Sequence, residues 1–268
     1  MTKNPSPVKL RSQTDKAEDF RALHHGRQIL ILPNAWDVPS ARVFEDEGFP
    51  AVATSSAGLM VSLGCPDGQV ISRDEYMSAI RKISRVLSVP LSADIVAGFG
   101  ATPKEVLATV REVLKAGAIG INIEDFAHAT KKLFPIETQV AKLKAIRKLG
   151  ETTGISLVIN ARTDAFYRDA GADCVYPMGL FDAASIRVFV QALDFPVNVM
   201  VRKGLPSVDE LERLGVARVS FGPSASYAAM GLLKRAAREV LEIGTYENLV
   251  EGAISFDELN SLALPRRN

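Results

Sequence analysis

Carboxylate side chains end two apolar runs of the chain, and an arginine ends a third. Asp94 closes one run, Glu124 and Asp125 close the next, and Asn160 and Arg162 close the third. Carboxylate oxygens suit a hard cation such as Mg2+, and a guanidinium binds an anionic group through a planar fork. If the runs are neighbouring strands, this pattern predicts a site for a metal ion beside an anion. The alternative is that these acids cap helices or pair with lysines.

Short apolar runs recur from residue 29 onward and would position these side chains. The runs are continuous rather than alternating, which is typical of parallel strands covered on both faces. We expect eight strands, at residues 29–32, 51–54, 91–94, 119–123, 157–160, 174–176, 197–201 and 218–221. In a barrel the polar residues that close such runs lie at one end, where reactive groups are found.

Helices are expected between most of these strands. Ser72, Thr102 and Ser207 each precede a glutamate by three residues, which is the capping-box pattern of a helix start. An alternating chain forms either a closed barrel or a doubly wound sheet. No Gly-x-Gly-x-x-Gly turn follows the first strand, so we predict an α/β fold, a (β/α)8 TIM barrel with a C-terminal helical extension.

The expected organisation is an N-terminal arm and helix at 1–28, the barrel at 29–243, and a C-terminal helical tail at 244–268. The helical material after Gly222 exceeds one barrel helix, which favours exchange of this segment in a homo-oligomer, a dimer or tetramer. Only residues 164–173 separate the fifth and sixth strands, which is near the minimum for a parallel crossover. We predict at most one helical turn there and an exposed stretch of barrel wall.

The composition limits the classes of partner. The 268 residues include 32 Lys plus Arg and 31 Asp plus Glu, so the basic field of a non-specific nucleic-acid binder is missing. The sequence contains neither a membrane-spanning apolar stretch nor a secretory signal, and Cys65 and Cys174 are too few for a disulfide framework. We expect one cytoplasmic domain acting on a small molecule, without a nucleic-acid or membrane partner.

Six polar motifs follow one another along residues 29–226. They are Leu32-Pro-Asn-Ala-Trp-Asp37, Thr54-Ser-Ser-Ala-Gly58, Ser62-Leu-Gly-Cys-Pro-Asp67, Ala93-Asp-Ile-Val-Ala-Gly-Phe-Gly100, Gly120-Ile-Asn-Ile-Glu-Asp125 and Asn160-Ala-Arg-Thr-Asp164. Their order resembles that of the isocitrate lyase and phosphoenolpyruvate mutase superfamily, and the chain looks most like the branch known as phosphonomutase or methylisocitrate-lyase-like.

The resemblance implies that a magnesium-bound 2-oxo or 2-hydroxy acid is cleaved or rearranged through an enolate. It places Asp94 and Glu124 in the magnesium shell and makes Arg162 and Asp67 the expected catalytic residues, with Asp67 at the entrance of the site. The substrate-binding residues that it implies are Ser55, Ser56, Ala57, Gly58, Asn160 and Arg162.

Departures from the family pattern fall at functional positions. Val96 stands where the family has a second acid before Gly-Phe-Gly, so we expect weak magnesium binding. Residues 126–135 lack the cysteine that serves as the acid in true isocitrate and methylisocitrate lyases. We expect His128 in this loop to be solvated, and Asn34 and Trp36 to serve packing.

Three functions remain open from the sequence. The first is a magnesium-dependent enzyme acting on a small 2-oxo or phosphono carboxylic acid as a lyase or mutase. The second is a catalytically impaired barrel that binds a small acid without turnover, which Val96 favours. The third is a phosphosugar enzyme with a phosphate cradle at residues 202–204 and 222–224, against which the order of the motifs argues.

Overall fold

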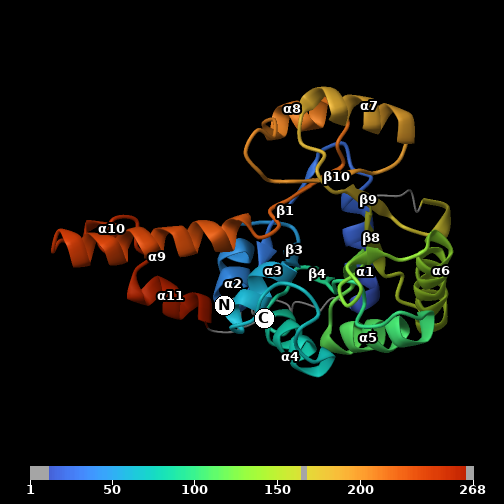
Figure 1. Cartoon of the computed structure of the whole chain (residues 1–268), viewed down its shortest axis with the longest axis horizontal. Coiled ribbons are helices and arrows are strands. Elements are labelled where there is room, and N and C mark those ends of the chain that lie inside the picture. Colours follow the sequence, from blue (N-terminus) through green and yellow to red (C-terminus); the bar gives the residue numbers. More distant parts are fainter. Residues whose placement is uncertain (1–11, 164–167, 264–268) are drawn as a thin grey trace, which may run out of the picture.

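The computed structural model describes residues 12–163 and 168–263, and its centre is a closed barrel of parallel strands (Figure 1). Six segments pair in the order β2-β3-β4-β5-β8-β9, and three pair in the order β1-β11-β10. A bridge between Val175 and Val197 joins the two sets at one side. At the other side β1 and β2 are consecutive segments of one strand, separated by Pro33.

The predicted (β/α)8 architecture is confirmed, and each expected strand is present. The segments are β1 Leu30–Leu32, β2 Asn34–Ala35, β3 Val52–Thr54, β4 Leu91–Asp94, β5 Gly120–Glu124, β8 Val158–Thr163, β9 Cys174–Pro177, β10 Asn198–Met200 and β11 Arg218–Ser220. Because all of them run parallel, their carboxyl ends form one rim.

Helices cover the outside of the barrel and begin where the capping residues predict. They are α2 Val38–Asp46, α3 Ser56–Ser62, α4 Arg73–Ser84, α5 Pro103–Ala116, α6 Ile136–Thr153, α7 Ala183–Leu193 and α8 Val208–Arg213. The hydroxyls of Ser72, Thr102 and Ser207 accept hydrogen bonds from the backbone N–H three residues later. A two-stranded hairpin, β6 Phe126–Ala127 with β7 Lys132–Leu133, follows β5 at the rim.

The amino end of the barrel is closed by α1 Gln13–Leu23. Phe20 of this helix is fully buried and packs with Leu30, Ile119 and Val158, residues of the strands above it or next to them. Helices and strands on one side of the barrel share a large apolar cluster, and a separate cluster lies under α7 and α8. The closed floor leaves the carboxyl rim as the open end.

The crossover between β8 and β9 is as short as the sequence indicates. Its described part holds a single 3-10 turn, Arg168–Ala170, which contacts α6. Residues 164–167, which belong to the same prediction and include Asp164, lie outside the described residues.

The C-terminal helices leave the barrel instead of completing its outer ring. In Figure 1, α9 Ser224–Glu242 projects away from the strands with α10 Glu247–Val250 at its side, and α11 Phe256–Ala263 returns to α2. Arg42 Nε donates a hydrogen bond of 2.9 Å to the carbonyl of Leu262 at this return. Within the described part of the chain, no helix is long and apolar enough to cross a membrane.

Candidate active site

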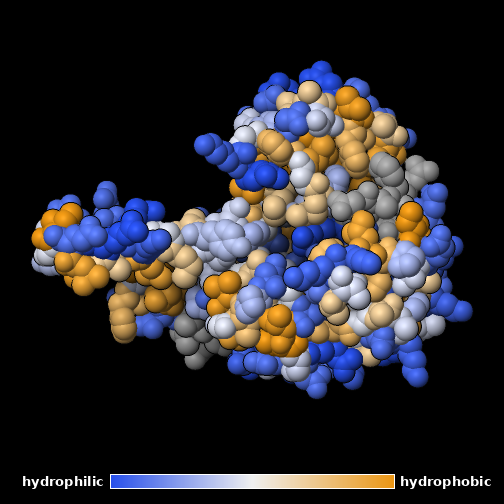
Figure 2. Space-filling view, viewed as in Figure 1, coloured by the Kyte–Doolittle hydropathy of each residue, from blue (hydrophilic) through white to orange (hydrophobic). Residues whose placement is uncertain are grey.

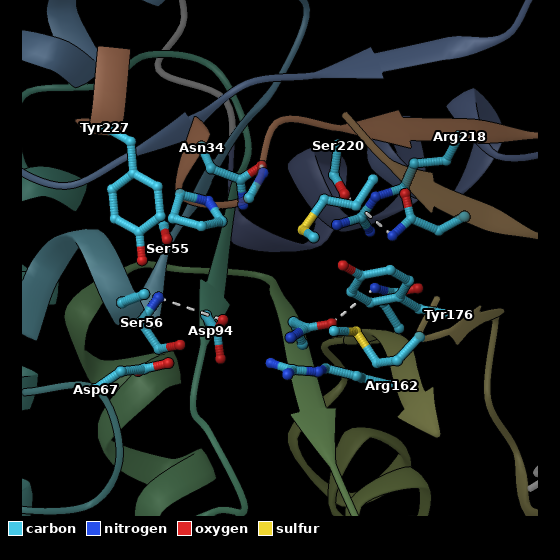
Figure 3. Close-up of a pocket in the computed structure, with 18 residues that line it drawn as sticks. Asn34, Ser55, Ser56, Asp67, Asp94, Arg162, Tyr176, Arg218, Ser220 and Tyr227 are labelled. Carbon is cyan, nitrogen blue, oxygen red and sulfur yellow. Dashed lines mark hydrogen bonds between the residues drawn. The ribbon is translucent and has the colours of Figure 1, made fainter. Parts of the chain in front are cut away.

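A polar cavity of about 150 Å3 opens at the carboxyl rim (Figure 3). It brings together residues that the sequence singled out on separate strands and loops. The predicted residues that line it are Ser55, Ser56, Ala57, Asp67, Asp94, Asn160 and Arg162. Glu124 and Gly58 are not part of its lining, although both contact residues that are.

Asp94 ends β4 and is buried with its carboxylate in the cavity. Its Oδ1 accepts from the N–H of Val96 at 3.0 Å. Its Oδ2 accepts from the N–H of Ser56 at 3.3 Å, and Figure 3 shows this second hydrogen bond. Burial raises the pKa of this carboxyl, and the charge of Arg162 and the two N–H donors oppose that rise. The negative charge of Asp94 is therefore incompletely compensated by the protein.

Glu124 and Arg162 lie opposite each other on the neighbouring strands β5 and β8. Arg162 Nη1 donates to Glu124 Oε2 at 2.8 Å, and Glu124 Oε1 contacts His128 Nε2. Burial raises the pKa of Glu124 while Arg162 lowers it, and burial lowers the pKa of Arg162 less than its acidic neighbours raise it. The ion pair thus fixes the orientation of a guanidinium that lines the cavity and could bind an anion there.

We expected His128 to be solvated because it lies in a loop, but the structure shows its ring in contact with Glu124. The β6–β7 hairpin folds back over the rim and puts its ring on Glu124, four residues earlier in the chain. The other ring nitrogen faces the loop of Asp67, since a Cβ on Gly68 would lie 3.1 Å from His128 Nδ1. His128 therefore links the acid on β5 to the entrance loop, a role that depends on the hairpin and not on local sequence.

The predicted serine and amide cluster forms the start of α3. Ser55 is the N-cap, and its hydroxyl accepts from the N–H of Gly58 at 3.2 Å. Ser55, Ser56 and Ala57 face the cavity, whereas Gly58 packs outward, where a Cβ would approach Trp36 Cβ to 2.9 Å. The glycine is required by this close packing. Since the N–H of Ser56 donates to Asp94 and that of Gly58 to Ser55, the N–H of Ala57 is the backbone donor at this helix start that could meet a ligand.

Asn34 closes the barrel and also lines the cavity. Its Nδ2 donates to the carbonyl of Thr54 at 2.8 Å, and its Oδ1 accepts from the N–H groups of Phe221 and Gly222, both at 2.9 Å. We expected Asn34 to serve packing. Its part in the structure is to join the first, second and last strands through the hydrogen bonds of its amide.

Several cavity residues were not predicted from the sequence. They are Asn122, Tyr176, Met178, Asn198, Met200, Arg218, Ser220 and Tyr227. Arg218 and Ser220 alternate with the buried Val219, and Asn198 and Met200 alternate with the buried Val199. This period of two along β10 and β11 is the signal that could have found them, because alternate residues of a strand face the barrel interior.

The cavity donors fit a magnesium ion that keeps water and substrate ligands. In the described ranges 12–163 and 168–263, no group of three or more His, Cys, Asp or Glu could hold a metal by itself. Mg2+ usually needs only one or two protein carboxylates. Asp94 and Asp67 line the cavity, and the buried Oδ1 of Asn160 has no hydrogen-bond partner within those ranges. All of these donors are oxygens, as Mg2+ requires.

Fold and site together define a (β/α)8 barrel with a cavity at its carboxyl rim that is lined by carboxylates and arginines. The family model for phosphoenolpyruvate phosphomutase matches residues 20–241, so the chain belongs to the phosphoenolpyruvate mutase family. The superfamily expected from the motif order is thereby confirmed. This is a family of lyases and mutases that act on small acids.

Individual relatives agree with this assignment. The chain is 30% identical to 2-methylisocitrate lyase of Escherichia coli (strain K12) over 270 residues, which covers 90% of this chain and 89% of that protein. A crystal structure from Burkholderia cenocepacia J2315, described as a lyase/mutase, has a TM-score of 0.87 at 36% identity and covers 94% of this chain and 97% of its own. Phosphonopyruvate hydrolase in complex with oxalate and Mg2+ shares the fold at a TM-score of 0.81 and 24% identity, covering 92% and 94% of the two chains.

Proposed function

We propose that the protein is a magnesium-dependent lyase or mutase that acts on a small 2-oxo or phosphono carboxylic acid through an enolate. The observation that carries this proposal is the meeting of Asp94, Arg162 and the start of α3 in one cavity. It combines a carboxylate whose charge the protein compensates incompletely with a guanidinium and helix N–H donors. A metal-chelated acid would fit this site, because the metal ion would bind the Asp94 carboxylate and the acid would bind the donors of Arg162 and of the start of α3.

The protein groups have distinct parts in this function. Arg162 binds the anionic end of the substrate, and its contact with Glu124 fixes the orientation of the guanidinium. Burial raises the pKa of Tyr176 to about 12, so its hydroxyl stays protonated and can donate to a developing oxyanion. Asp67, on the entrance loop, faces the cavity as the carboxylate placed for proton transfer.

Asp94 and Glu124 would hold the magnesium ion. Asp94 lines the cavity, and Glu124 ends the neighbouring strand β5, where it also contacts Arg162. The ion would supply a Lewis acid that stabilises the enolate oxygen. Asn160 and Asn122, joined by a hydrogen bond of 2.8 Å, provide amide groups on the same wall.

A second candidate function is a catalytically impaired barrel that binds the acid without turnover. Val96 favours it, because this buried side chain replaces an acid of the family with a group that cannot bind a cation or its water. The hairpin at 126–133 also lacks a cysteine acid. The phosphosugar function has no comparable support, since the matched family acts on small acids.

The deciding experiment titrates Mg2+ into the full chain while following loss of oxaloacetate, phosphonopyruvate and 2-methylisocitrate, with oxalate binding measured by calorimetry. Magnesium-dependent loss of one substrate supports the enzyme. Magnesium-dependent oxalate binding without loss of any substrate supports the impaired barrel. Absence of both in the wild type, matching an Asp94→Ala control, would overturn both candidates.

We also propose that the protein is a homo-oligomer, at least a dimer, formed by its C-terminal helices. Leu241, Ile243 and Phe256 are 85%, 73% and 81% exposed on the projecting arm, and Figure 2 shows apolar side chains along it. The outer face of β1 meanwhile borders a cavity of about 330 Å3 lined by Ile31 and Phe49, where the eighth barrel helix would pack. A helix from a second copy would cover that wall and bury the arm.

A further inference from the structure

Arg218 is a second guanidinium in the cavity, and neither the proposed chemistry nor the family relationship assigns it a role. It enters from β11 on the side opposite Arg162 in Figure 3, with Tyr176 drawn between the two. Its side chain is 2% exposed. It precedes Ser220 by two residues on the same strand face, so it starts deeper in the barrel than the rim residues.

Within the described part of the chain, the charge of Arg218 has no acidic partner in an ion pair. Among residues 12–163 and 168–263 no carboxylate forms an ion pair with it, and its Nη1 is buried without a hydrogen-bond partner. Arg162, by contrast, has Glu124. A buried charge without a partner is costly, and natural proteins retain one chiefly where a ligand supplies the missing group.

The surroundings of Arg218 suit an anion better than a neutral group. The Asn198 amide and the Ser220 hydroxyl lie beside it on the cavity wall and are hydrogen-bonded to each other at 3.1 Å. The protonated Tyr176 hydroxyl lines the same side. Burial lowers the pKa of Arg218, and Cys174, Tyr176 and, less strongly, Asp94 oppose that fall. None of the cavity-lining residues from β9, β10 and β11 is a carboxylate, so this wall offers an anion the Arg218 guanidinium and the Tyr176 hydroxyl without a competing negative side chain.

We propose that Arg218 binds a second carboxylate of the substrate, so that the protein selects short dicarboxylic acids over monocarboxylic acids of equal length. This inference rests on the proposed function, in which Arg162 and the magnesium site hold the first end of the acid. The cavity of about 150 Å3 is of the size that holds one small organic molecule, which suits a short-chain acid. Arg218 is then a specificity-determining residue at the inner end of the site.

A matched ligand pair tests the inference: malate and 2-hydroxybutyrate have the same carbon chain, and only malate has a second carboxylate. Calorimetry with Mg2+ should show that the wild type prefers malate by about 10 to 100-fold, the range expected for hydrogen bonds to a charged group. Arg218→Gln should abolish this preference. It should leave oxalate affinity within about twofold, because oxalate is too short to reach Arg218 when both of its carboxylates bind at the magnesium and Arg162 end. Arg218→Lys should retain part of it, and the exposed control Arg111→Gln should retain all of it.

Thermal unfolding separates a binding role from a structural one. Because the charge is buried and unpaired, Arg218→Met should keep or raise the Tm of the ligand-free protein, whereas a structural arginine would lower it. Persistence of the malate preference in Arg218→Gln would overturn the inference. Malate binding that needs Arg218, in a protein that does not bind oxalate, would retain the inference and refute the proposed function; binding of none of the three acids would refute both.

Discussion

The backbone N–H of Val96 donates to Asp94 Oδ1 at 3.0 Å, while Val96 itself has a φ of 55°. A β-branched residue is strained in this left-handed region, which suits Gly, Asn or Asp. The carbonyl of Val96 in turn accepts from the N–H of Glu124 at 2.9 Å. Hydrogen bonds to both expected magnesium ligands, Asp94 and Glu124, thus hold Val96 in a backbone conformation that a valine disfavours.

Replacement of Val96 by asparagine should improve stability, and replacement by aspartate should improve metal binding. Relief of the left-handed strain is worth about 1 kcal/mol or more, and the new carboxylate restores an oxygen near the ion, worth about 10 to 100-fold in Mg2+ affinity. Chemical denaturation and magnesium calorimetry measure the two effects. Val96→Asn separates them, because it should gain the stability with a smaller gain in affinity. Unchanged Mg2+ affinity in Val96→Asp and Val96→Glu would contradict the assignment of Asp94 and Glu124.

Replacement of Arg162 by glutamine should cost about 100-fold in oxalate affinity, since it removes the guanidinium that meets the anion. It also leaves Glu124 without its cationic partner, so the free energy of unfolding should fall by about 1–3 kcal/mol. The double variant Arg162→Gln/Glu124→Gln removes both charges and should recover stability without recovering oxalate binding. A double variant no more stable than Arg162→Gln would show that the pair does not couple.

His24 should make the protein less stable in mild acid. Burial, reinforced by the charge of Arg218, lowers the pKa of His24 to about 3, and its Nδ1 lies 2.8 Å from the Phe20 carbonyl. In the unfolded chain His24 binds a proton near pH 6.5, whereas in the folded chain it stays neutral until about pH 3. Stability therefore falls as the pH decreases below 7. This group alone should cost about 2 kcal/mol between pH 7 and pH 5.

Denaturation at the two pH values tests this expectation with His24→Asn, which keeps a donor near the Phe20 carbonyl and cannot titrate. The variant should lose most of that difference, whereas the exposed neighbour variant His25→Asn should keep it. An equal pH dependence in wild type and His24→Asn would rule out His24 as its source.

The oligomer should depend on the apolar arm. Leu241→Asp/Phe256→Glu should convert the proposed dimer or larger species to a monomer in sizing chromatography with light scattering, because both side chains are exposed in the single chain. Val188→Asp, at a residue 69% exposed on α7, is the control and should leave the assembly intact. A monomeric wild type would refute the proposal.

The sequence by itself determined the barrel and the rim residues of its first half. Parallel strands buried on both faces must be continuous apolar runs, and the polar residue that ends each run must lie at the carboxyl rim. Asp94, Ser55 and Arg162 were therefore identifiable one strand at a time. The short crossover after β8 could also be predicted, because the number of residues between the two strands limits how much helix can form there.

Only the tertiary structure decided which groups meet across the barrel. Arg218 and Asn198 lie inside strands, where a polar residue has no local feature that distinguishes a cavity wall from an outer face until the barrel closes and fixes the inward side. His128 reaches Glu124 only because a hairpin folds the loop back. Among the described residues Arg162 has an acidic partner and Arg218 has none. This charge balance depends on distances between strands far apart in the chain, and local sequence patterns do not contain those distances.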